Sequence, residues 1–581
     1  MQEGKWSLDA LYPSYESAEY QADLARFEAI FADFEALDIT DSIENIKAAI
    51  KLLEEYTVLV RRLFAYSSLQ LSTDTSDQVS LKAQAKLHKI NAAGTAILTK
   101  VSQFIGATQI DPASDPDLAD YDFYFQEAKQ ENQHRLSDEV EAVIARMNMS
   151  AGAAWSQLQS LLTSTVEHDF KGRSVNLSEI RNLAYDPDPE IRKAAYETEL
   201  VMYDTIKEPV AFALNNIKSQ VIDLADLRGY ESPLAKTLED SRMSQATLDA
   251  LLEAIKESLP AFRKYFKHKG KLLGHDQGLP FYDLFAPMGS QENSKTYTPE
   301  EAKNYLVKHF SKFSPDLADM VETMYQAQAI DYFPRKGKRG GAFCSNLPFI
   351  DSSRIMLNFE GSLSDIVTFA HELGHAYHGV QIADLKPLNR SYTMPVAETA
   401  STFNEALIME SLLSEADDQE KISLLESQIS DTAQIIVDIY SRFLFEDAVF
   451  RERQDQFLFS KDLEAIMLDA QKQSYGEGLD PDYLHPYMWV CKSHYYSTGL
   501  SYYNFPYAFG GLFSRGLYAL YQAQPDGFVA KYKNMLKATT TQSVEDTAAI
   551  MGLDVTTPAF WTQALDQVAA LIDQFISLTS K

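Results

Sequence analysis

The sequence predicts a mostly α-helical protein with one small β-sheet. Apolar residues recur every three or four positions over long stretches, as in helices with one buried face, and a single short region breaks this pattern with strand-forming residues. The 581 residues are 45% hydrophobic and 12% aromatic, a composition that fills a large core and differs from that of a disordered chain. We therefore expect a globular, largely helical molecule.

The helical periodicity is clearest in four stretches, which are 53–71, 191–227, 244–266 and 560–578. Segments rich in proline and turn-forming residues interrupt it at 110–122, 185–190 and 275–302. No internal repeat and no Gly/Ser-rich linker accompanies these breaks. They predict three regions, with boundaries near residues 110 and 180: a helical region 1–110, a small helical domain 111–180 and a large domain 181–581.

Charge and cysteine content limit the partners and the cellular compartment that the sequence allows. The formal net charge of −31 disfavours nucleic acid and anionic membrane surfaces as partners. Cys344 and Cys491 are the only cysteines, too few for a disulfide framework, so a reducing compartment is favoured. The first residues lack the apolar core of a signal peptide, and no run of about 18 apolar residues predicts a membrane span. We expect a cytoplasmic protein without nucleic-acid or membrane partners.

The strand-forming residues stand directly before the most informative motif. Segments 338–349 and 353–361 combine glycines with β-branched and aromatic residues, which predicts a small hairpin or sheet. Such a sheet could simply cap a helix layer. Alternatively, an exposed strand beside a catalytic helix could hold an extended peptide through backbone hydrogen bonds. The sequence leaves both interpretations open.

Residues 371–380 read HELGHAYHGV and hold three of the eleven histidines. Helical geometry places His371 and His375 about 40° apart, on the face opposite the apolar stripe, where both imidazoles can bind one Zn²⁺. Glu372 flanks that position and can accept a proton from a water that the metal acidifies. A chance HExxH match is expected only roughly 0.016 times in a chain of this length. We predict one zinc ion per chain, with Glu372 as catalytic base.

A third metal ligand must come from another segment, because His378 lies roughly 10 Å along the helix from His371. The predicted helix 395–413 carries Glu398 and Glu405 two turns apart. If it packs antiparallel against the first helix, Glu398 can complete the site and Glu405 can orient a histidine from outside. The alternative is that both are solvated acids of an acidic protein. The role of His378 is left open.

A tyrosine-rich segment at 493–511 offers hydrogen-bond donors for a transition state. Peptide hydrolysis builds negative charge on the carbonyl oxygen, and phenol or imidazole groups aimed at that oxygen stabilise it. The candidates are His494, Tyr503 and Tyr507, with Tyr502 as a further possible phenol. The same aromatic residues could instead only fill a core.

HELGHAYH followed by VAETASTFNEAL resembles the thimet oligopeptidase and oligoendopeptidase F family of zinc endopeptidases. KRGGAFC and NFPYAFGGLFSRGLY are similar to its oligoendopeptidase F branch. The family's ligands are two histidines and a glutamate that corresponds here to Glu398, and a His and Tyr loop contacts the substrate. The resemblance implies a multi-helix zincin body that encloses a deep substrate channel. It also implies that 111–180 is the family's small N-terminal domain and that 181–581 is the catalytic domain.

The function implied by the resemblance is zinc-dependent hydrolysis of short, unstructured oligopeptides. The chain departs from the family spacing between His494 and Tyr503, and Phe505 stands where a tyrosine often occurs, so the choice among the phenols is open. A helical zinc carboxypeptidase or dipeptidyl carboxypeptidase would need a cation for the substrate's free C-terminus, and the sequence identifies none. A non-catalytic peptide-binding protein is the alternative from another class. Oligomeric state and side-chain preference are not predicted.

Overall fold

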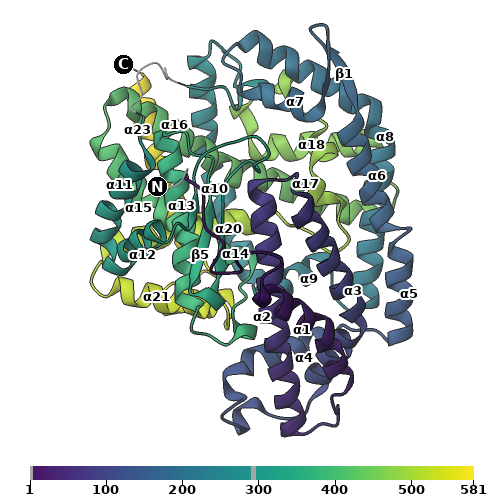
Figure 1. Ribbon diagram of the computed structural model, residues 1–581. Helices are drawn as coiled ribbons and strands as arrows, with labels where there is room; N and C mark the ends of the chain where they lie inside the picture. The colour runs from purple at the N-terminus through teal and green to yellow at the C-terminus, as the bar shows by residue number, and fades with distance from the viewer. Residues whose placement is uncertain (1–3, 289–295, 581) are drawn as a thin grey trace.

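The computed structural model describes residues 4–288 and 296–580, and it confirms a mostly helical fold (Figure 1). Within these ranges the strands form one two-stranded and one three-stranded sheet. Each stretch of strong helical periodicity forms most of one long helix. These helices are α2 (Ile43–Thr73), α8 (Pro189–Leu227), α10 (Gln245–Leu272) and α23 (Pro558–Thr579).

The first helices form a layer with its own hydrophobic core. They are α1 (Ala18–Glu35), α2, α3 (Gln78–Ala107) and α4 (Asp122–Gln133), drawn in purple and blue at the lower part of Figure 1. Ser17, Ser42 and Asp77 cap the first three helices by accepting hydrogen bonds from backbone N–H groups of the first turn. Phe27 and Leu63 are fully buried between these helices.

A wall of helices continues from this layer along the right-hand edge of Figure 1. It contains α5 (Asp138–Asn148), α6 (Gly152–Thr165) and α8, and α6 packs against α8. A hairpin of β1 (Glu167–Phe170) and β2 (Arg173–Asn176) follows α6 and leads into α7 (Leu177–Asn182). After α8 come α9 (Pro233–Asp240) and α10.

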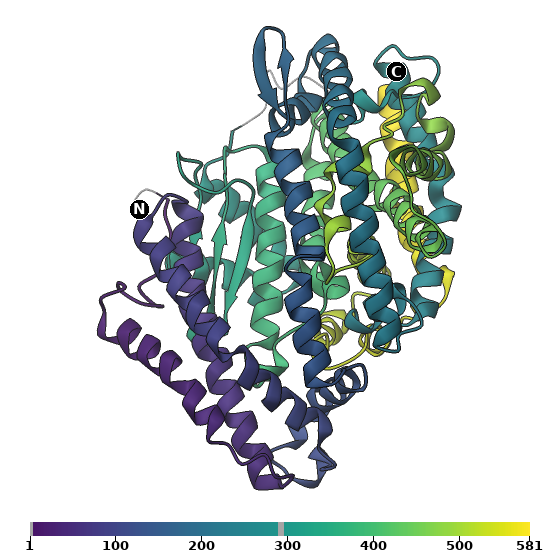
Figure 2. The same cartoon turned by 90° about the vertical axis from the view of Figure 1, so that its right-hand side faces the viewer.

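The predicted hairpin before the histidine motif is present as two strands of a three-stranded sheet. After α11 (Pro299–Phe313) and α12 (Pro315–Gln326), the strands are β3 (Ile330–Asp331), β4 (Phe343–Leu347) and β5 (Ser352–Met356). They lie in the order β3-β5-β4, with β4 antiparallel to β5 and at the edge. Figure 2 shows the sheet between the N-terminal helices and the helix that carries the histidine motif.

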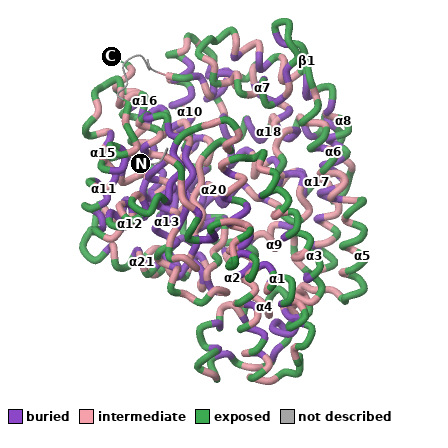
Figure 3. The backbone as a smooth tube through the Cα atoms, in the orientation of Figure 1, coloured by how far each residue is buried: buried purple, intermediate pink, exposed green. Residues whose placement is uncertain are grey.

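The remaining helices surround that motif. They are α13 (Leu363–Ile382), α14 (Met394–Ala397), α15 (Thr399–Glu415), α16 (Asp418–Ala433), α17 (Ile439–Arg453), α18 (Ser460–Ser474), α19 (Met488–Cys491), α20 (Phe505–Ala523), α21 (Phe528–Ala538) and α22 (Val544–Ile550), with α23 as the last. A π-helical turn, Gln434–Asp438, joins α16 to α17. Buried residues are concentrated around α13 and α20, whereas the residues of α5 are exposed or intermediate throughout (Figure 3).

The helix of the histidine motif begins at Leu363, because Ser362 caps it and Asp365 reaches back to the cap backbone. Ile366 is fully buried, as the apolar stripe predicts. Val380, at the other end of the stripe, is 51% exposed, although Ile382 in the same last turn is buried.

Regional boundaries and membrane crossing were also expectations of the sequence. The boundary near 110 falls just after α3 and that near 180 falls inside α7. The division into three regions stays a prediction. In the described part of the chain, no helix combines the length and the apolar composition that crossing a bilayer requires.

Candidate active site

The α13 and α15 helices pack antiparallel at unusually short distance. Gly374 of α13 faces α15 so closely that a Cβ there would stand 2.3 Å from the Ala400 carbonyl oxygen, so only glycine fits without displacement. Asn404 Nδ2 donates to the Ala370 carbonyl oxygen at 3.3 Å. Later residues of α15 thus meet earlier residues of α13, which is the antiparallel return that the sequence predicts.

Glu398 lies at a break in the predicted helix 395–413. The chain forms α14, then a turn at Glu398, then α15, so the prediction of one continuous helix is wrong at this residue. Ser401 Oγ, three residues later, donates to Glu398 Oε2 at 2.8 Å. The turn and this hydrogen bond aim the carboxylate at α13.

Three donor atoms from these helices converge. His371 Nε2 and His375 Nε2 are 3.2 Å apart, and Glu398 Oε2 is 3.3 Å from each of them. A tetrahedral zinc ion with ligands at about 2.0–2.1 Å has edges of about 3.4 Å between ligand atoms. In the described ranges this is the group of His, Cys, Asp or Glu side chains whose ligand atoms lie close enough to hold one metal ion. The donor set therefore fits zinc in both chemistry and spacing.

Two carboxylates determine the electrostatics of His371. Its Nδ1 hydrogen-bonds Glu405 Oε1, while its Nε2 faces Glu398. Burial alone would lower the pKa of His371, but the two carboxylates outweigh it and raise that pKa to about 10. Burial works against ionisation of Glu398 too, yet the two histidines hold its pKa well below the usual range. Glu405 thus occupies the outer position from which it can orient a ligand.

Glu372 stands beside this group without a partner of its own. It is only 5% exposed, and its buried Oε2 makes no hydrogen bond within the described residues. Burial raises its pKa, opposed by the neighbouring His371 and His375. A buried carboxylate without a partner, next to His371 and His375, can serve as the proton acceptor for a reacting water.

His378, whose role the sequence leaves open, lies in the core. Its Nε2 is 3.1 Å from the Leu536 carbonyl oxygen and 2.9 Å from Thr539 Oγ1, and its ring stacks on Tyr392. Burial lowers the pKa of His378 to about 3. This histidine ties α13 to α21 and does not approach the three donor atoms.

The predicted His and Tyr loop brings three of its candidates together. His494 stacks on Tyr503 with ring centroids 4.5 Å apart, and the Tyr507 hydroxyl donates to the Tyr503 hydroxyl at 3.0 Å. Gly510, one helical turn after Tyr507 on α20, packs its Cα against the Glu398 side chain, since a Cβ there would lie 3.2 Å from Glu398 Cβ. Tyr507 and Gly510 share a face of α20, so the phenol is on the side of the candidate metal site.

Tyr502, the alternative phenol, points elsewhere. It is 4% exposed, packs between Phe443 and Phe450 and donates its hydroxyl to Asp447 at 3.2 Å. Its φ of +52° is a left-handed conformation that turns the chain between Tyr502 and Tyr503, and so separates the two rings. The choice among the three phenols therefore narrows to Tyr503 and Tyr507.

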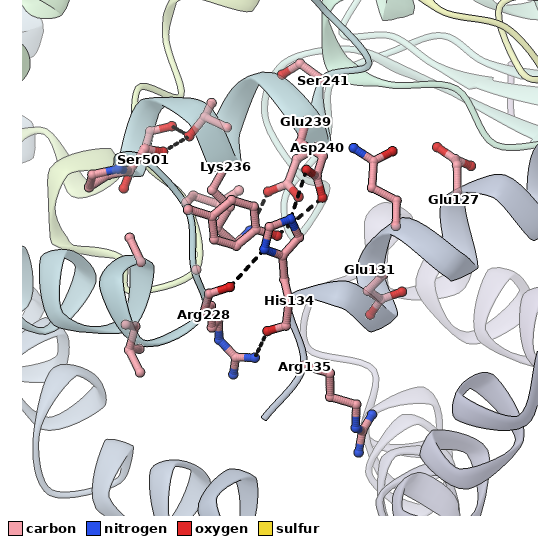
Figure 4. Close-up of a pocket in the computed structure, with 18 of the residues that line it drawn as sticks. Glu127, Glu131, His134, Arg135, Arg228, Lys236, Glu239, Asp240, Ser241 and Ser501 are labelled. Atoms are coloured by element: carbon pink, nitrogen blue, oxygen red, sulfur yellow. Dashed lines mark hydrogen bonds and ion pairs between the residues drawn. The ribbon is translucent and has the colours of Figure 1, made fainter. Parts of the chain in front are cut away.

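A cavity of about 990 Å³ adjoins the loop and includes Tyr503, Met394 and Pro506 in its lining. Figure 4 shows its charged wall, where side chains from α4, α8 and α9 face one another. Most of these charges are already paired: Arg228 bonds Glu141, Lys236 bonds Asp240, and His134 faces Glu239. The cavity provides room beside the catalytic candidates.

The sequence did not predict the residues that position the metal-ligand candidates from outside the site. Asn346 of β4 donates to the His375 carbonyl oxygen at 3.0 Å, and Gly379 leaves the space for it. Ser401 and Gly374 fix Glu398 and the helix spacing. Ser401 could have been found from its position one turn after Glu398, whereas the role of Asn346 depends on a tertiary contact without local signal.

Comparison with known proteins gives the family. The model of "Peptidase family M3" matches residues 182–567, and that of "Oligopeptidase F" matches residues 109–167. Oligopeptidase PepF from Bacillus subtilis is 24% identical, over 100% of this chain and 88% of the relative. The chain belongs to peptidase family M3, with the oligopeptidase F domain in its N-terminal part. The predicted resemblance is confirmed.

Solved structures agree in fold. A crystal structure of a protein assigned as a peptidase from Chlamydophila abortus is 22% identical with a TM-score of 0.86, covering 99% of this chain and 98% of that chain. Oligoendopeptidase-F from Enterococcus faecium is 19% identical with a TM-score of 0.72, covering 97% and 99%. Family membership supports peptidase activity on peptide substrates and implies a bound metal, typically zinc.

Proposed function

We propose that the protein is a zinc-dependent endopeptidase that hydrolyses short, unstructured oligopeptides. The observation that carries the proposal is the triangle formed by His371 Nε2, His375 Nε2 and Glu398 Oε2, with sides of 3.2 and 3.3 Å, next to the buried and unpartnered carboxylate of Glu372. A set of three protein ligands with an open fourth position is typical of catalytic zinc.

His371, His375 and Glu398 would hold one zinc ion per chain. Zinc in such a site supplies Lewis acidity, which polarises a peptide carbonyl and lowers the pKa of water. Glu405 keeps the His371 ring oriented with Nε2 inward, because it accepts a hydrogen bond from Nδ1. The family membership of the chain supports this assignment.

Glu372 takes the role of general base. Its carboxylate accepts a proton from the attacking water and later delivers it to the amine that leaves. Tyr507 and His494 donate to the oxygen on which negative charge develops. In the resting structure the Tyr507 hydroxyl donates to the Tyr503 hydroxyl, and with substrate bound Tyr503 would become the donor to Tyr507 and so orient it. Burial lowers the pKa of His494, so its neutral imidazole can donate from one ring nitrogen.

Substrate would bind in extended form along β4. This strand is at the edge of its sheet and contacts α13 through Asn346 and His375, so its free backbone groups run beside the site. Backbone pairing holds peptides of many sequences. A deep channel enclosed by helices, as the family resemblance implies, would admit an extended chain and exclude folded proteins.

We also propose the setting and division that the sequence predicts: regions 1–110, 111–180 and 181–581, a cytoplasmic location and no nucleic-acid partner. Two free thiols, Cys344 and Cys491, support a reducing compartment. The net charge of −31 supports the absence of a phosphate-backbone partner.

Turnover of an internally quenched peptide tests the function. The purified protein should cleave a peptide of about ten residues, lose activity with a zinc chelator and regain it when zinc is added back. A non-catalytic peptide-binding protein would bind the peptide and leave it intact. A strict carboxypeptidase would release only the last residue or dipeptide, and mass analysis of the products would reveal this. Either result would refute the proposed endopeptidase.

A further inference from the structure

A second cavity, of about 680 Å³, lies where α7 and α8 meet the segment that leads into the His and Tyr loop. Its walls come from α7, α8, the segment around Phe285, the π-helical turn Gln434–Asp438, and the stretch from Cys491 to Lys492. The lining carries three cationic side chains, Arg181, Arg192 and Lys492, and two acidic ones, Glu199 and Asp438. Arg192 is bonded to Asp283 and Asp438 to Arg442, which leaves Arg181 and Lys492 as the cations for an anionic ligand.

Lys492 has no partner of its own in this cavity. Within the described residues, its ammonium makes neither a hydrogen bond nor an ion pair. Asp438, an acid that also lines the cavity, is engaged by Arg442 at 2.5 Å. Burial lowers the pKa of Lys492, which means that the chain solvates this ammonium poorly. An anion that reaches the cavity would supply the missing partner.

Arg181 is the second cation of the cavity, and it is only partly engaged. Its Nε faces Glu199 Oε1 at 3.3 Å, and its terminal nitrogens make no hydrogen bond within the described ranges. Guanidinium nitrogens in this state suit a carboxylate, which they can bind at two points. Tyr185, 61% exposed, packs on Phe285 with ring centroids 5.0 Å apart and adds an apolar shelf to the same cavity.

The cavity adjoins the catalytic candidates. Lys492 precedes His494 by two residues, a stretch that spans at most about 7 Å. From the opposite wall, Ile435 of the π-helical turn packs against Gly511, where a Cβ would lie 2.4 Å from Ile435 Cδ1. The neighbouring Gly510 packs on Glu398. π-helical turns occur frequently at functional sites.

We propose that this cavity binds the free C-terminal carboxylate of the peptide substrate, with Lys492 as the main cation, Arg181 as the second, and the Tyr185 and Phe285 shelf under the last side chain. This inference rests on the proposed peptidase function and names the end by which substrates are held. Lys492 and Arg181 are specificity-determining residues, and short peptides that end near the site are the favoured substrates.

The larger cavity does not offer the same chemistry. There Arg228 and Lys236 are each neutralised by an acid within 2.7 Å, so a carboxylate would have to displace an existing partner. In the smaller cavity the ammonium of Lys492 is available without such a displacement. The contrast assigns the peptide's carboxyl end to the smaller cavity.

Paired peptides test the assignment. One quenched peptide is made with a free C-terminal carboxylate and, in the same sequence, with a C-terminal amide. The wild type should show about tenfold or higher kcat/KM for the acid, mainly through KM, because a charge-assisted hydrogen bond is lost in the amide. Lys492→Gln should remove this preference by slowing the acid and leaving the amide unchanged, and Lys492→Arg should restore much of it.

The controls separate this inference from the function on which it rests. Lys264→Gln, an exposed lysine paired with Asp573, should keep the wild-type acid-to-amide ratio. Binding of both peptides to Glu372→Gln protein is measured by fluorescence anisotropy, so a carboxylate preference is detectable even without turnover. If the wild type binds acid and amide equally, or Lys492→Gln weakens both equally, the inference is wrong.

A third peptide distinguishes the two sources of a carboxylate. It carries a C-terminal amide and an aspartate as its last side chain. Recovery of the acid-like kcat/KM with this peptide would overturn the assignment to the chain terminus, because a side-chain carboxylate would then serve as well. If circular dichroism shows that Lys492→Gln does not fold, the acid-to-amide ratio of kcat/KM is compared between the wild type and Arg181→Gln instead. A lower ratio in Arg181→Gln supports the assignment, and an equal ratio contradicts it.

Discussion

The helix pair α13 and α15 and the loop from His494 to Tyr507 flank the same site but differ in how complete they are. In the helix pair, two of the three ligand side chains are held by a partner in the chain: His371 Nδ1 hydrogen-bonds Glu405, and Glu398 Oε2 accepts from Ser401. In the loop, His494 Nδ1 is buried without a hydrogen bond in the described structure. The first region is organised before substrate arrives, whereas the second keeps a ring nitrogen of His494 unpaired among the described residues.

This difference indicates that the helix pair binds the metal and the loop stabilises the transition state. A metal ligand must be held in place at all times, because a loose ligand weakens affinity. A donor for the transition state contributes only when charge develops, so a partner in the resting protein would compete with the substrate. Substitutions in the helix pair should therefore change metal content, and substitutions in the loop should change turnover alone.

Glu372→Gln is expected to have the largest effect on turnover among variants that keep the metal. It removes the proton acceptor but none of the three converging donor atoms, so kcat should fall by about a thousandfold or more. Metal content and kcat are measured on the same preparation. Retention of wild-type kcat would show that another group activates water.

Tyr507→Phe should lower kcat and kcat/KM together by about a hundredfold, because one donor to the developing charge is lost while the ring remains. Tyr503→Phe should cost less, since its hydroxyl is placed to orient Tyr507. Tyr502→Phe is the matched control: it loses the bond to Asp447 and should change thermal stability, not kcat. Activity of Tyr507→Phe within about twofold of wild type would make this phenol structural.

Glu405→Ala should weaken metal affinity by about ten- to a hundredfold without emptying the site at saturating zinc, as is typical when a group behind a ligand is removed. Glu410→Ala, on the same helix but bonded to Tyr518, is the control and should leave affinity unchanged. Competition with a chelating dye measures both. Complete loss of zinc in Glu405→Ala together with retention in Glu398→Ala would show that Glu405, and not Glu398, is the third metal ligand.

Gly374→Ala should be the mildest of these changes in turnover and act through packing. The added Cβ meets the α15 backbone at 2.3 Å, so the helices must separate, at a cost of about 1–3 kcal/mol in the free energy of unfolding. Gly499→Ala is the control, because nothing lies within 4 Å of a Cβ there. Equal melting temperatures for both variants would show that the close helix contact is not required.

The same comparison explains what the sequence could predict. His371, Glu372 and His375 lie on one helix, so their relation follows from helical geometry alone. Glu398 and Glu405 required only one further assumption, an antiparallel neighbour. The break at Glu398, the support from Asn346 and the inward turn of Tyr502 could not be predicted, because a positive φ and contacts between distant segments leave no periodic pattern. The burial of Lys492 could not be predicted either, because it depends on segments that are distant in the sequence.

The zinc content of the purified protein and of two variants tests the central claim most directly. Elemental mass spectrometry should find one zinc per chain in the wild type, almost none in His375→Ala, and a strongly reduced amount in Glu398→Ala, since each substitution removes one of three converging donors. Glu372→Gln should match the wild type. Full zinc occupancy in His375→Ala, or a wild type that takes up no zinc when it is supplied, would contradict this account of the site.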